Sequence, residues 1–417
     1  MQSHYLLRRI SPSGQIETSR RGKGFEGFSM VLDNGPQAMP ETRRLGTICV
    51  PEGLDRPPLV SIVVTNYNYA TFLRTCLNSI VRQRYPSLEC IIVDDASSDG
   101  SVGIIRDFLA EIDPAFPFRL VALPKNGGQM NAFHEGFSES KGVFVVFVDA
   151  DDCLFEDFVW THVRAHLSRD CTAAMTCSDA VVVDGGGQII AGLRRGRAAD
   201  PGTRARLSDT MPVECRLVAG WQETWRIEDD SMTVTEPPAP LRYVPPAANF
   251  ERDWIWTSTS AVMFRRNALD IVMSDRTKGL RISADFYLFQ FCHLIGGTVL
   301  VPGAHGAYRR HGANNFARDV TLSHLTVTGS GTGSGKGFGE MWDLIRAEVV
   351  ANGDFLHALL GRLPFIGLLT ILYPLREYRT ARRALGGKSR ANGVILFAQM
   401  FRRQVHVARR RLGRIFG

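Results

Sequence analysis

Three carboxylates stand within four residues, at Asp149, Asp151 and Asp152, directly after the apolar stretch at 142–148. Carboxylates this close repel one another when they are bare. Mg²⁺ and Mn²⁺ bind carboxylate and phosphate oxygens, so a divalent cation at this place would relieve the repulsion. An acidic turn capping the next helix would use the same residues, and the motif alone does not separate the two interpretations.

Polar residues follow three other apolar stretches of the chain. They are Thr65–Asn68, Asp94–Asp95 and Lys125–Gly128. An acid after a strand of a doubly wound sheet commonly accepts hydrogen bonds from a nucleotide's ribose or base. An Asx-turn would explain Asp94–Asp95 equally well, and a plain loop or turn would explain the other two stretches.

Strands are predicted at 59–65, 88–93, 119–123 and 142–148, and helices at 72–81, from 99 or 101 to before 114, and at 131–138. Strands alternating with helices of about ten residues indicate βαβ units and a mostly parallel sheet. Ligands bind beyond the carboxyl ends of such strands, so the four polar stretches are expected to meet at one edge. After residue 175 the pattern is mixed, with strands at 174–183, 260–264 and 298–301 and a helix at 286–294.

Several stretches together resemble the family 2 nucleotide-sugar glycosyltransferases, which have the GT-A fold. They are VSIVVTNYNYATFLRTCLNSIVRQRYPSLECIIVDDASSDGS, NGGQMNAFHEGFSESKGVFVVFVDADD, WTSTSAVMFRRNAL, ISADFYLF and YRRHGANN, within residues 58–316. The resemblance implies an α/β fold, GT-A or Rossmann-like, with a mostly parallel sheet and helices on both faces.

The resemblance also implies a nucleotide site, formed by Thr65, Tyr67, Asp94, Asp95, Asn126, Asn131 and Asp149. Thr65, Tyr67 and Asp95 would hold the base, with Asp94 supporting them. Asn126 and Asn131 would line the pocket. Asp149 would contact the ribose or the water shell of a metal ion.

For the chemistry, the resemblance implies a divalent cation, Mn²⁺ or Mg²⁺, with Asp151 as its direct ligand and Asp152 beside it. His311 would complete the metal site or bind phosphate, and Arg309 would neutralise the charge of the leaving diphosphate. Asp285 matches the position of the general base, although many members carry two acids there and this chain has one.

The resemblance predicts a metal-dependent, inverting glycosyltransferase that uses a nucleoside diphosphate sugar, with uridine diphosphate the commonest donor type among relatives. The acceptor would be a glycan or a lipid-linked molecule in cell-surface polysaccharide or glycoconjugate synthesis. Trp254 and Trp256 would stack on the acceptor sugar, or else belong to the core. A non-catalytic nucleotide-sugar or membrane-binding scaffold is the alternative. The first strand-to-helix turn, TNYNYATF, lacks the GxGxxG of a dinucleotide oxidoreductase.

The positive charge is concentrated at one end of the chain. Of 49 basic and 42 acidic residues, residues 376–417 hold twelve and one, which leaves the rest with a net charge of −4. This distribution disfavours a nucleic-acid enzyme. An apolar stripe of the tail has helical spacing, at Phe397, Phe401, Val405, Ala408, Leu412 and Ile415. A basic amphipathic helix of this kind predicts peripheral binding to the inner face of the cell membrane. A helix docked on the body is the alternative.

Five regions are expected along the chain. They are a loosely ordered leader at 1–57, a nucleotide-sugar half at 58–175, an acceptor half at 176–318 with an irregular insertion at 192–250, a linker at 319–340 and a helical tail at 341–417. The Gly-rich part of the linker lacks the Ser or Thr that follows the lysine of a phosphate-binding loop. The apolar segment 365–375 is too short to cross a bilayer, and an interfacial, re-entrant or core segment fits it. No secretory signal is visible, and the eight cysteines without CxxC spacing indicate reduced thiols in the cytoplasm.

Overall fold

The computed structural model describes residues 57–113, 117–168, 172–191, 241–246, 255–311, 314, 334–385 and 390–413, with short strands at 8–10, 16–18 and 211–213. Predictions that fall elsewhere, including the one for Trp254 and most of those for the leader and the insertion, lie outside this part.

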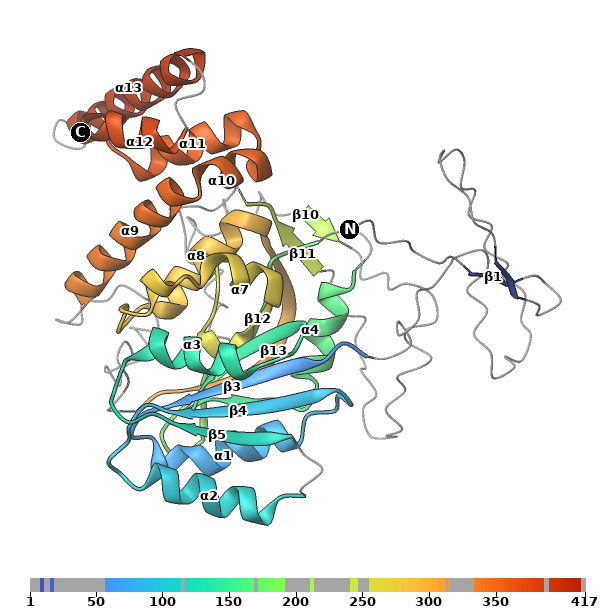
Figure 1. Ribbon diagram of the computed structural model, residues 1–417. Coiled ribbons are helices and arrows are strands. Elements are labelled where there is room, and N and C mark those ends of the chain that lie inside the picture. Colours follow the sequence, from blue (N-terminus) through green and yellow to red (C-terminus); the bar gives the residue numbers. More distant parts are fainter. Residues whose placement is uncertain are drawn as a thin grey trace.

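The first half of the body is a run of βαβ units (Figure 1). Its strands are β3 (Val60–Asn66), β4 (Leu88–Asp94), β5 (Phe118–Ala122) and β6 (Phe144–Asp149), and its helices are α1 (Ala70–Val81), α2 (Ser101–Glu111) and α3 (Gln129–Glu139). The strands are parallel and lie in the order β6, β3, β4, β5. The elements predicted here from apolar periodicity are confirmed, with boundary shifts of a few residues.

The second half extends the same sheet. It contains β7 (Cys153–Leu154), α4 (Phe158–His166), β8 (Met175–Val183), β9 (Ile189–Ala191), β10 (Met211–Val213), β11 (Leu241–Val244), η1 (Thr259–Ala261), β12 (Val262–Arg265), α7 (Arg266–Val272), η2 (Asp275–Thr277), α8 (Ala284–Gly296) and β13 (Thr298–Arg309). Along the path β10, β11, β13, β8, β12, β6, β3, β4, β5, only β11 and β12 run against the others. The fold class is therefore the predicted one, a mostly parallel α/β sheet. β10 and β11 show that the segment predicted as an irregular insertion contributes two strands.

The two faces of the sheet carry separate cores. Val60, Ile62 and Val64 of β3 pack in the cluster that includes α1, α2 and α4. Val63 faces the opposite cluster, under α3, α7 and α8. A Cβ at Gly136 of α3 would lie 2.1 Å from a methyl group of Val63, so this glycine lets α3 lie close on the strand. This two-sided burial fixes the register of β3, and hence the position of the polar residues that follow it.

The C-terminal region is helical, as predicted. It consists of α9 (Ser334–Ala351), α10 (Gly353–Leu360), α11 (Arg362–Leu372), η4 (Leu375–Glu377), α12 (Tyr378–Ala384) and α13 (Arg390–Gly413). Because α9 begins at Ser334, the end of the predicted linker is helical. Phe365, Ile366 and Leu369 of α11 are fully buried, so the apolar segment 365–375 is a core helix. Among the described helices, none is long and apolar enough to cross a membrane.

These helices share a core with the body and are tied to it by a buried carboxylate. Met341, Ile345 and Leu356 belong to the same cluster as Tyr287 of α8. Glu348 of α9 is 1% exposed and accepts hydrogen bonds from Arg276 at 2.7 Å and Ser274 at 3.0 Å. A buried charge is tolerated when it is paired in this way. The C-terminal helices are thus part of the folded unit.

Candidate functional site

The predicted polar groups meet at one edge of the sheet, where the parallel strands end. Thr65 lies opposite Asp149 in the β3–β6 pairing, and Asn66 lies opposite Asp94 in the β3–β4 pairing. The register is set by the apolar residues upstream, so the carboxyl ends of the three strands lie level. A ligand placed here would contact all three loops at once.

Asp94 and Asp95 organise the loops of this edge. Asp94 accepts a hydrogen bond from the Asn66 amide at 2.7 Å and one from the backbone N–H of Ser97 at 2.9 Å. Asp95 accepts the backbone N–H groups of Gly127 and Gly128 at 2.7 and 2.8 Å. Both carboxylates are buried. They thereby hold the loops after β3, β4 and β5 together, whereas the neighbouring Tyr67 is 46% exposed and presents its ring to solvent.

Among the described residues, the non-glycine positions with positive φ all lie in loops of this edge. They are Asn68 at φ 61°, Ala96 at φ 62° and Ser283 at φ 62°. The left-handed conformation costs about 1 kcal/mol or more for a residue with a Cβ. Strain of this kind persists where surrounding contacts impose it, and it gathers at functional sites.

The loop before α3 is closed by the segment before α8. The guanidinium of Arg281 donates to the side chain and the backbone carbonyl of Asn126. Gly128 has φ 89°, and a Cβ there would lie 2.8 Å from the Arg281 backbone, so only glycine fits. The side chain of Asn131 packs against Gly127. Asn126 and Asn131 therefore both line this loop.

Asp149 is the centre of an acidic cluster. Burial, followed by the negative charges of Asp151 and Asp285, raises the pKa of Asp149 to about 7, against hydrogen bonds from Thr259 and Gln129 that lower it. Asp285 lies in the first turn of α8 and is half-buried. The structure thus brings the predicted base within electrostatic range of the predicted metal-binding carboxylates, although 136 residues separate Asp285 from Asp149 in the sequence.

Asp152 ties the acidic loop to two other segments of the chain. One of its carboxylate oxygens accepts the backbone N–H of Arg309 at 2.9 Å, and the other accepts the Ser260 hydroxyl at 2.8 Å. Burial and the charges of Asp151 and Asp149 raise its pKa. These two hydrogen bonds hold the acidic loop against β13 and η1.

Asp151 faces the segment that follows β13. Its Oδ2 lies 3.0 Å from Nε2 of His311 and accepts a hydrogen bond from the Asn314 amide at 3.2 Å. The side chain of Asn314 also accepts the backbone N–H of His311 at 2.5 Å. His311 and Asp151 are both nearly buried. This pair is the strongest candidate for cation coordination among the predicted residues.

Arg309 also contacts the acidic loop. Its guanidinium donates to the carbonyl oxygens of Asp151 at 2.9 Å, Asp184 at 3.2 Å and Gly185 at 3.3 Å. The guanidinium lies over the ring of Phe72 of α1, 5.0 Å from its centroid, and His311 lies 4.5 Å from the same ring. Arg309 therefore positions the acidic loop.

Trp256 is a core residue. It is 2% exposed, its indole N–H donates to Thr298 at 3.1 Å, and its ring packs on Phe289 and His293. A buried indole with its N–H satisfied has no face left for a sugar. The stacking role predicted for Trp256 is therefore wrong, and the core alternative is correct.

We expect Trp256→Ala to destabilise the fold by about 3–5 kcal/mol, because it leaves a large cavity and removes one of the two hydrogen-bonding partners of the Thr298 hydroxyl. Urea unfolding followed by tyrosine fluorescence measures the change. A loss below about 1 kcal/mol would contradict the core assignment. Trp160→Ala, at a half-buried ring on α4, is the matched control and should cost less.

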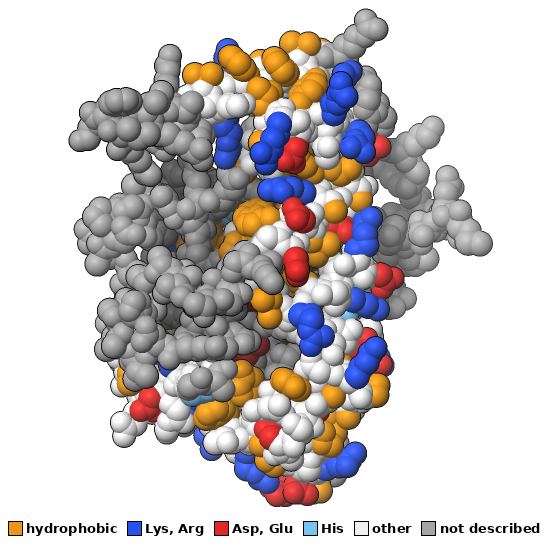
Figure 2. Space-filling view, turned by 90° about the vertical axis from the view of Figure 1, so that its left-hand side faces the viewer, with side chains coloured by type: hydrophobic (Ala, Val, Ile, Leu, Met, Phe, Trp, Pro, Cys, Tyr) orange, Lys and Arg blue, Asp and Glu red, His pale blue; other side chains and the backbone are white. Residues whose placement is uncertain are grey.

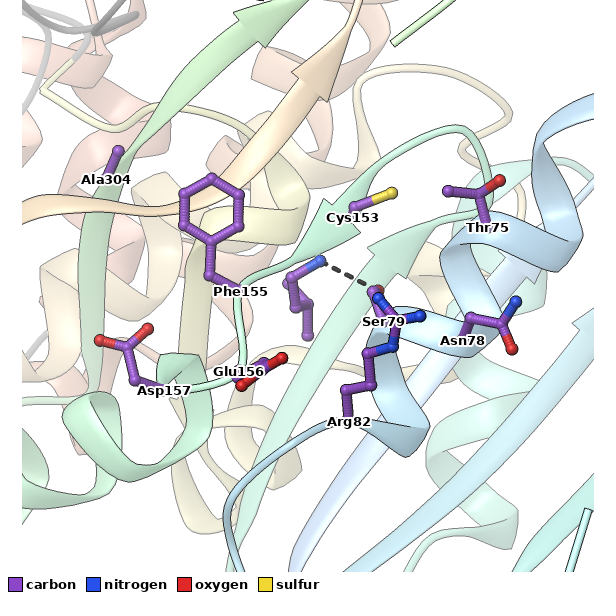
Figure 3. Close-up of a pocket in the computed structure, with 10 residues that line it drawn as sticks. Thr75, Asn78, Ser79, Arg82, Cys153, Phe155, Glu156, Asp157 and Ala304 are labelled. Carbon is purple, nitrogen blue, oxygen red and sulfur yellow. Dashed lines mark hydrogen bonds between the residues drawn. The ribbon is translucent and has the colours of Figure 1, made fainter. Parts of the chain in front are cut away.

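A separate surface pocket of 630 Å³ lies under the acidic loop (Figure 3). Thr75, Asn78, Ser79 and Arg82 of α1 line one side, and the segment 153–157 lines the other. The Ser79 hydroxyl accepts the backbone N–H of Leu154 at 3.1 Å, the bond drawn in Figure 3. None of the predicted site residues lines this pocket. The candidate site is therefore the strand-end edge.

Comparison with known proteins agrees with this geometry. The family model described as Glycosyl transferase family 2 matches residues 61–211, which span β3 to β6 and the acidic loop. This segment of the chain is similar to glycosyl transferase family 2.

Curated relatives of this chain carry glycosyltransferase names. A glycosyltransferase of Nostoc sp. is 27% identical over 257 residues, 61% of this chain and 66% of the relative. TuaG of Bacillus subtilis, named for teichuronic acid biosynthesis, is 30% identical over 31% of this chain and 50% of its own length. GlyA of Streptococcus pneumoniae is 35% identical over 24% of this chain and 14% of its own length. The matches thus span two thirds or less of these relatives.

The comparison with solved structures found two nucleotide complexes among its matches. S. aureus TarS 1–349 in complex with UDP has a TM-score of 0.43 and 15% identity, over 84% of this chain and 92% of that chain. The mannosyltransferase PcManGT from Pyrobaculum calidifontis, in complex with GDP-Man and Mn²⁺, has a TM-score of 0.42 and 15% identity, over 83% and 88%.

Several residues of the candidate site escaped the sequence interpretation. They are Tyr69, Phe72, Gln129, Thr259, Ser260, Arg281 and Asn314. Most stand inside the stretches that carry the resemblance, so their polar character was visible. Their partners were not, because each contacts a segment far away in the sequence.

Proposed function

We propose that this chain is a metal-dependent, inverting glycosyltransferase that moves a sugar from a nucleoside diphosphate to an acceptor hydroxyl. The observation that carries the proposal is the convergence of Asp149, Asp151, His311 and Asp285 at the ends of the central strands. A carboxylate and imidazole pair beside a second and a third carboxylate suits charge stabilisation on one side and proton removal on the other.

The donor groups fit a divalent cation. Among the described residues, no group of three or more His, Cys, Asp or Glu side chains is arranged to hold a metal ion by itself. Mg²⁺ and Mn²⁺ are commonly bound by one or two protein carboxylates together with substrate phosphates, so a three-ligand protein cage is not required. Asp151 and His311 would hold the ion, with Asp149 near its water shell. When bound, the cation would stabilise negative charge on the departing diphosphate.

Asp285 would act as the general base. It would take the proton of the acceptor hydroxyl while the hydroxyl oxygen bonds to the anomeric carbon and the bond from that carbon to the diphosphate oxygen breaks. A single displacement of this kind inverts the configuration at the anomeric carbon. Arg309 and Asp152 keep the acidic loop in place during the step, because they tie it to β13.

The loops after β3, β4 and β5 would hold the nucleotide, with Thr65 and Tyr67 at the base and Asn126 and Asn131 along the pocket. A uridine nucleotide is the first donor to test, since it is the commonest type in the family. The relative named for teichuronic acid biosynthesis supports a glycan or lipid-linked acceptor in cell-surface polysaccharide synthesis.

A two-stage assay tests the proposal. The first stage measures melting temperature with uridine and guanosine diphosphate sugars, each with Mn²⁺, Mg²⁺ or a chelator, because a ligand of the native state stabilises it by mass action. At 100 times the Kd the expected gain is about 2.7 kcal/mol. The second stage follows release of nucleoside diphosphate with glycan and lipid-linked acceptors. Binding without turnover for any acceptor would favour the non-catalytic scaffold, and no binding at all would contradict both functions.

A further inference from the structure

Helix α13 presents an apolar stripe to solvent. Its members recur at steps of three and four residues, and their exposed fractions are 69% for Val394, 48% for Phe397, 52% for Phe401 and 36% for Val405. The rings of Phe397 and Phe401 stack on each other with centroids 6.4 Å apart. Large side chains left in water in a row cost free energy, so such a row marks an interaction surface.

The stripe is not the face by which α13 is attached to the body. Leu396 and Met400 are 0% and 2% exposed and pack in the core cluster shared with α11. The Tyr378 hydroxyl of α12 donates to the carbonyl of Gly393, beside the start of the stripe. Successive residues of a helix are rotated by about 100°, so the buried face and the stripe lie side by side around α13. Helix α13 is therefore docked on the body through one face and exposes an apolar stripe on another. The sequence pattern had left a docked helix and a membrane-binding helix as alternatives.

Basic side chains surround the stripe. Arg379 and Arg382 of α12 and Arg402 of α13 are exposed, and Arg382 reaches the backbone of Gly393. Over 376–417 the sequence has twelve basic residues and one acid, Glu377. Figure 2 shows hydrophobic side chains gathered at the end of the molecule formed by the C-terminal helices, with Lys and Arg among and around them.

We propose that this end of the molecule binds an anionic lipid surface, with the stripe of α13 inserted at the level of the headgroups and acyl chains and the arginines on lipid phosphates. An apolar row bordered by cations matches the two components of such a surface. A second copy of the chain fits poorly, because a symmetric interface would place this patch against itself and bring arginine against arginine. The proposal goes beyond the sugar transfer and does not depend on the identity of the donor.

Vesicle co-sedimentation with the full chain tests the proposal. Vesicles of phosphatidylcholine alone are compared with vesicles that also contain phosphatidylglycerol, at low salt and at about 1 M salt, where the Debye length is about 3 Å. We expect binding only to the anionic vesicles, with most of it lost at high salt. Each of Arg379→Gln and Arg402→Gln should weaken binding about fivefold, whereas Arg106→Gln on α2 should not.

The apolar contribution has its own variants and control. Phe401→Ser should weaken binding about tenfold at low salt, and Ile189→Ser, at an exposed position of the body, should leave it unchanged. Both should melt like the parent chain, because neither side chain is buried. These substitutions are preferable to truncation before α13, which would uncover Leu396 and Met400.

Equal sedimentation with both kinds of vesicle, or with neither, would overturn the proposal. So would salt-resistant self-association that Phe401→Ser abolishes, since the stripe would then bind a second copy. Donor binding measured on the same preparations separates this result from a failure of the proposed transfer reaction.

Discussion

Asp151→Asn should reduce sugar transfer by at least about a hundredfold while the protein remains folded. The substitution keeps the shape of the side chain and removes the charge that, with His311, would hold the cation. A cation at a departing diphosphate supplies several kcal/mol of transition-state stabilisation, and each 1.36 kcal/mol is tenfold in rate. The melting temperature should change little, because the asparagine keeps an oxygen that can accept the Asn314 amide, and the loss of the charge relieves repulsion with Asp149 and Asp152.

The measurements are initial transfer rates across a Mn²⁺ titration and melting temperatures with donor in the presence and absence of Mn²⁺. Asp152→Asn is the matched control. It disturbs the hydrogen bonds with Arg309 and Ser260, so its main effect should be a lower melting temperature. Its effect on the cation dependence of transfer should be smaller than that of Asp151→Asn. A normal transfer rate in Asp151→Asn, or an unchanged stabilisation by Mn²⁺ and donor, would contradict the assignment of Asp151 as the ligand.

Asp285→Asn should lower the turnover rate by about 10²–10⁴-fold and leave donor affinity nearly unchanged. General base catalysis is worth about this factor, and an amide cannot accept the proton of the acceptor hydroxyl. The loss should fall on kcat because the residue acts on the acceptor side of the acidic cluster. Removing the charge of Asp285 should also lower the pKa of Asp149, because that charge is one of the causes of the raised pKa.

Donor affinity by calorimetry and single-turnover transfer rates separate binding from chemistry. Asp270→Asn, an exposed acid on the neighbouring helix α7, controls for a general change in charge. Asp285→Glu keeps a base near the site and should recover part of the rate. If donor affinity fell while turnover stayed normal, Asp285 would belong to the nucleotide site and the base would lie elsewhere.

The sequence by itself determined the sheet, its strand-end edge and most of the residues at that edge. This is possible because the apolar periodicity of stretches such as 59–65 and 142–148 is local, and burial on both faces leaves each strand one register. Parallel strands joined by helices must then bring their carboxyl ends to the same edge. Thr65, Asp94 and Asp149 could therefore be placed together without coordinates.

Only the tertiary structure decided what several of these residues do. Asp152 and Arg309 have the types expected of a ligand and a phosphate-binding group, yet their hydrogen-bonding groups are taken by partners more than a hundred residues away. The sequence allows Trp256 to be a sugar-stacking ring, but in the structure it is buried and its indole N–H donates to Thr298. On α13 the same helical periodicity describes the buried face and the exposed stripe. The type of a residue sets which hydrogen bonds its side chain can make. The partners of these side chains lie in distant segments of the chain, so a local sequence pattern does not specify them.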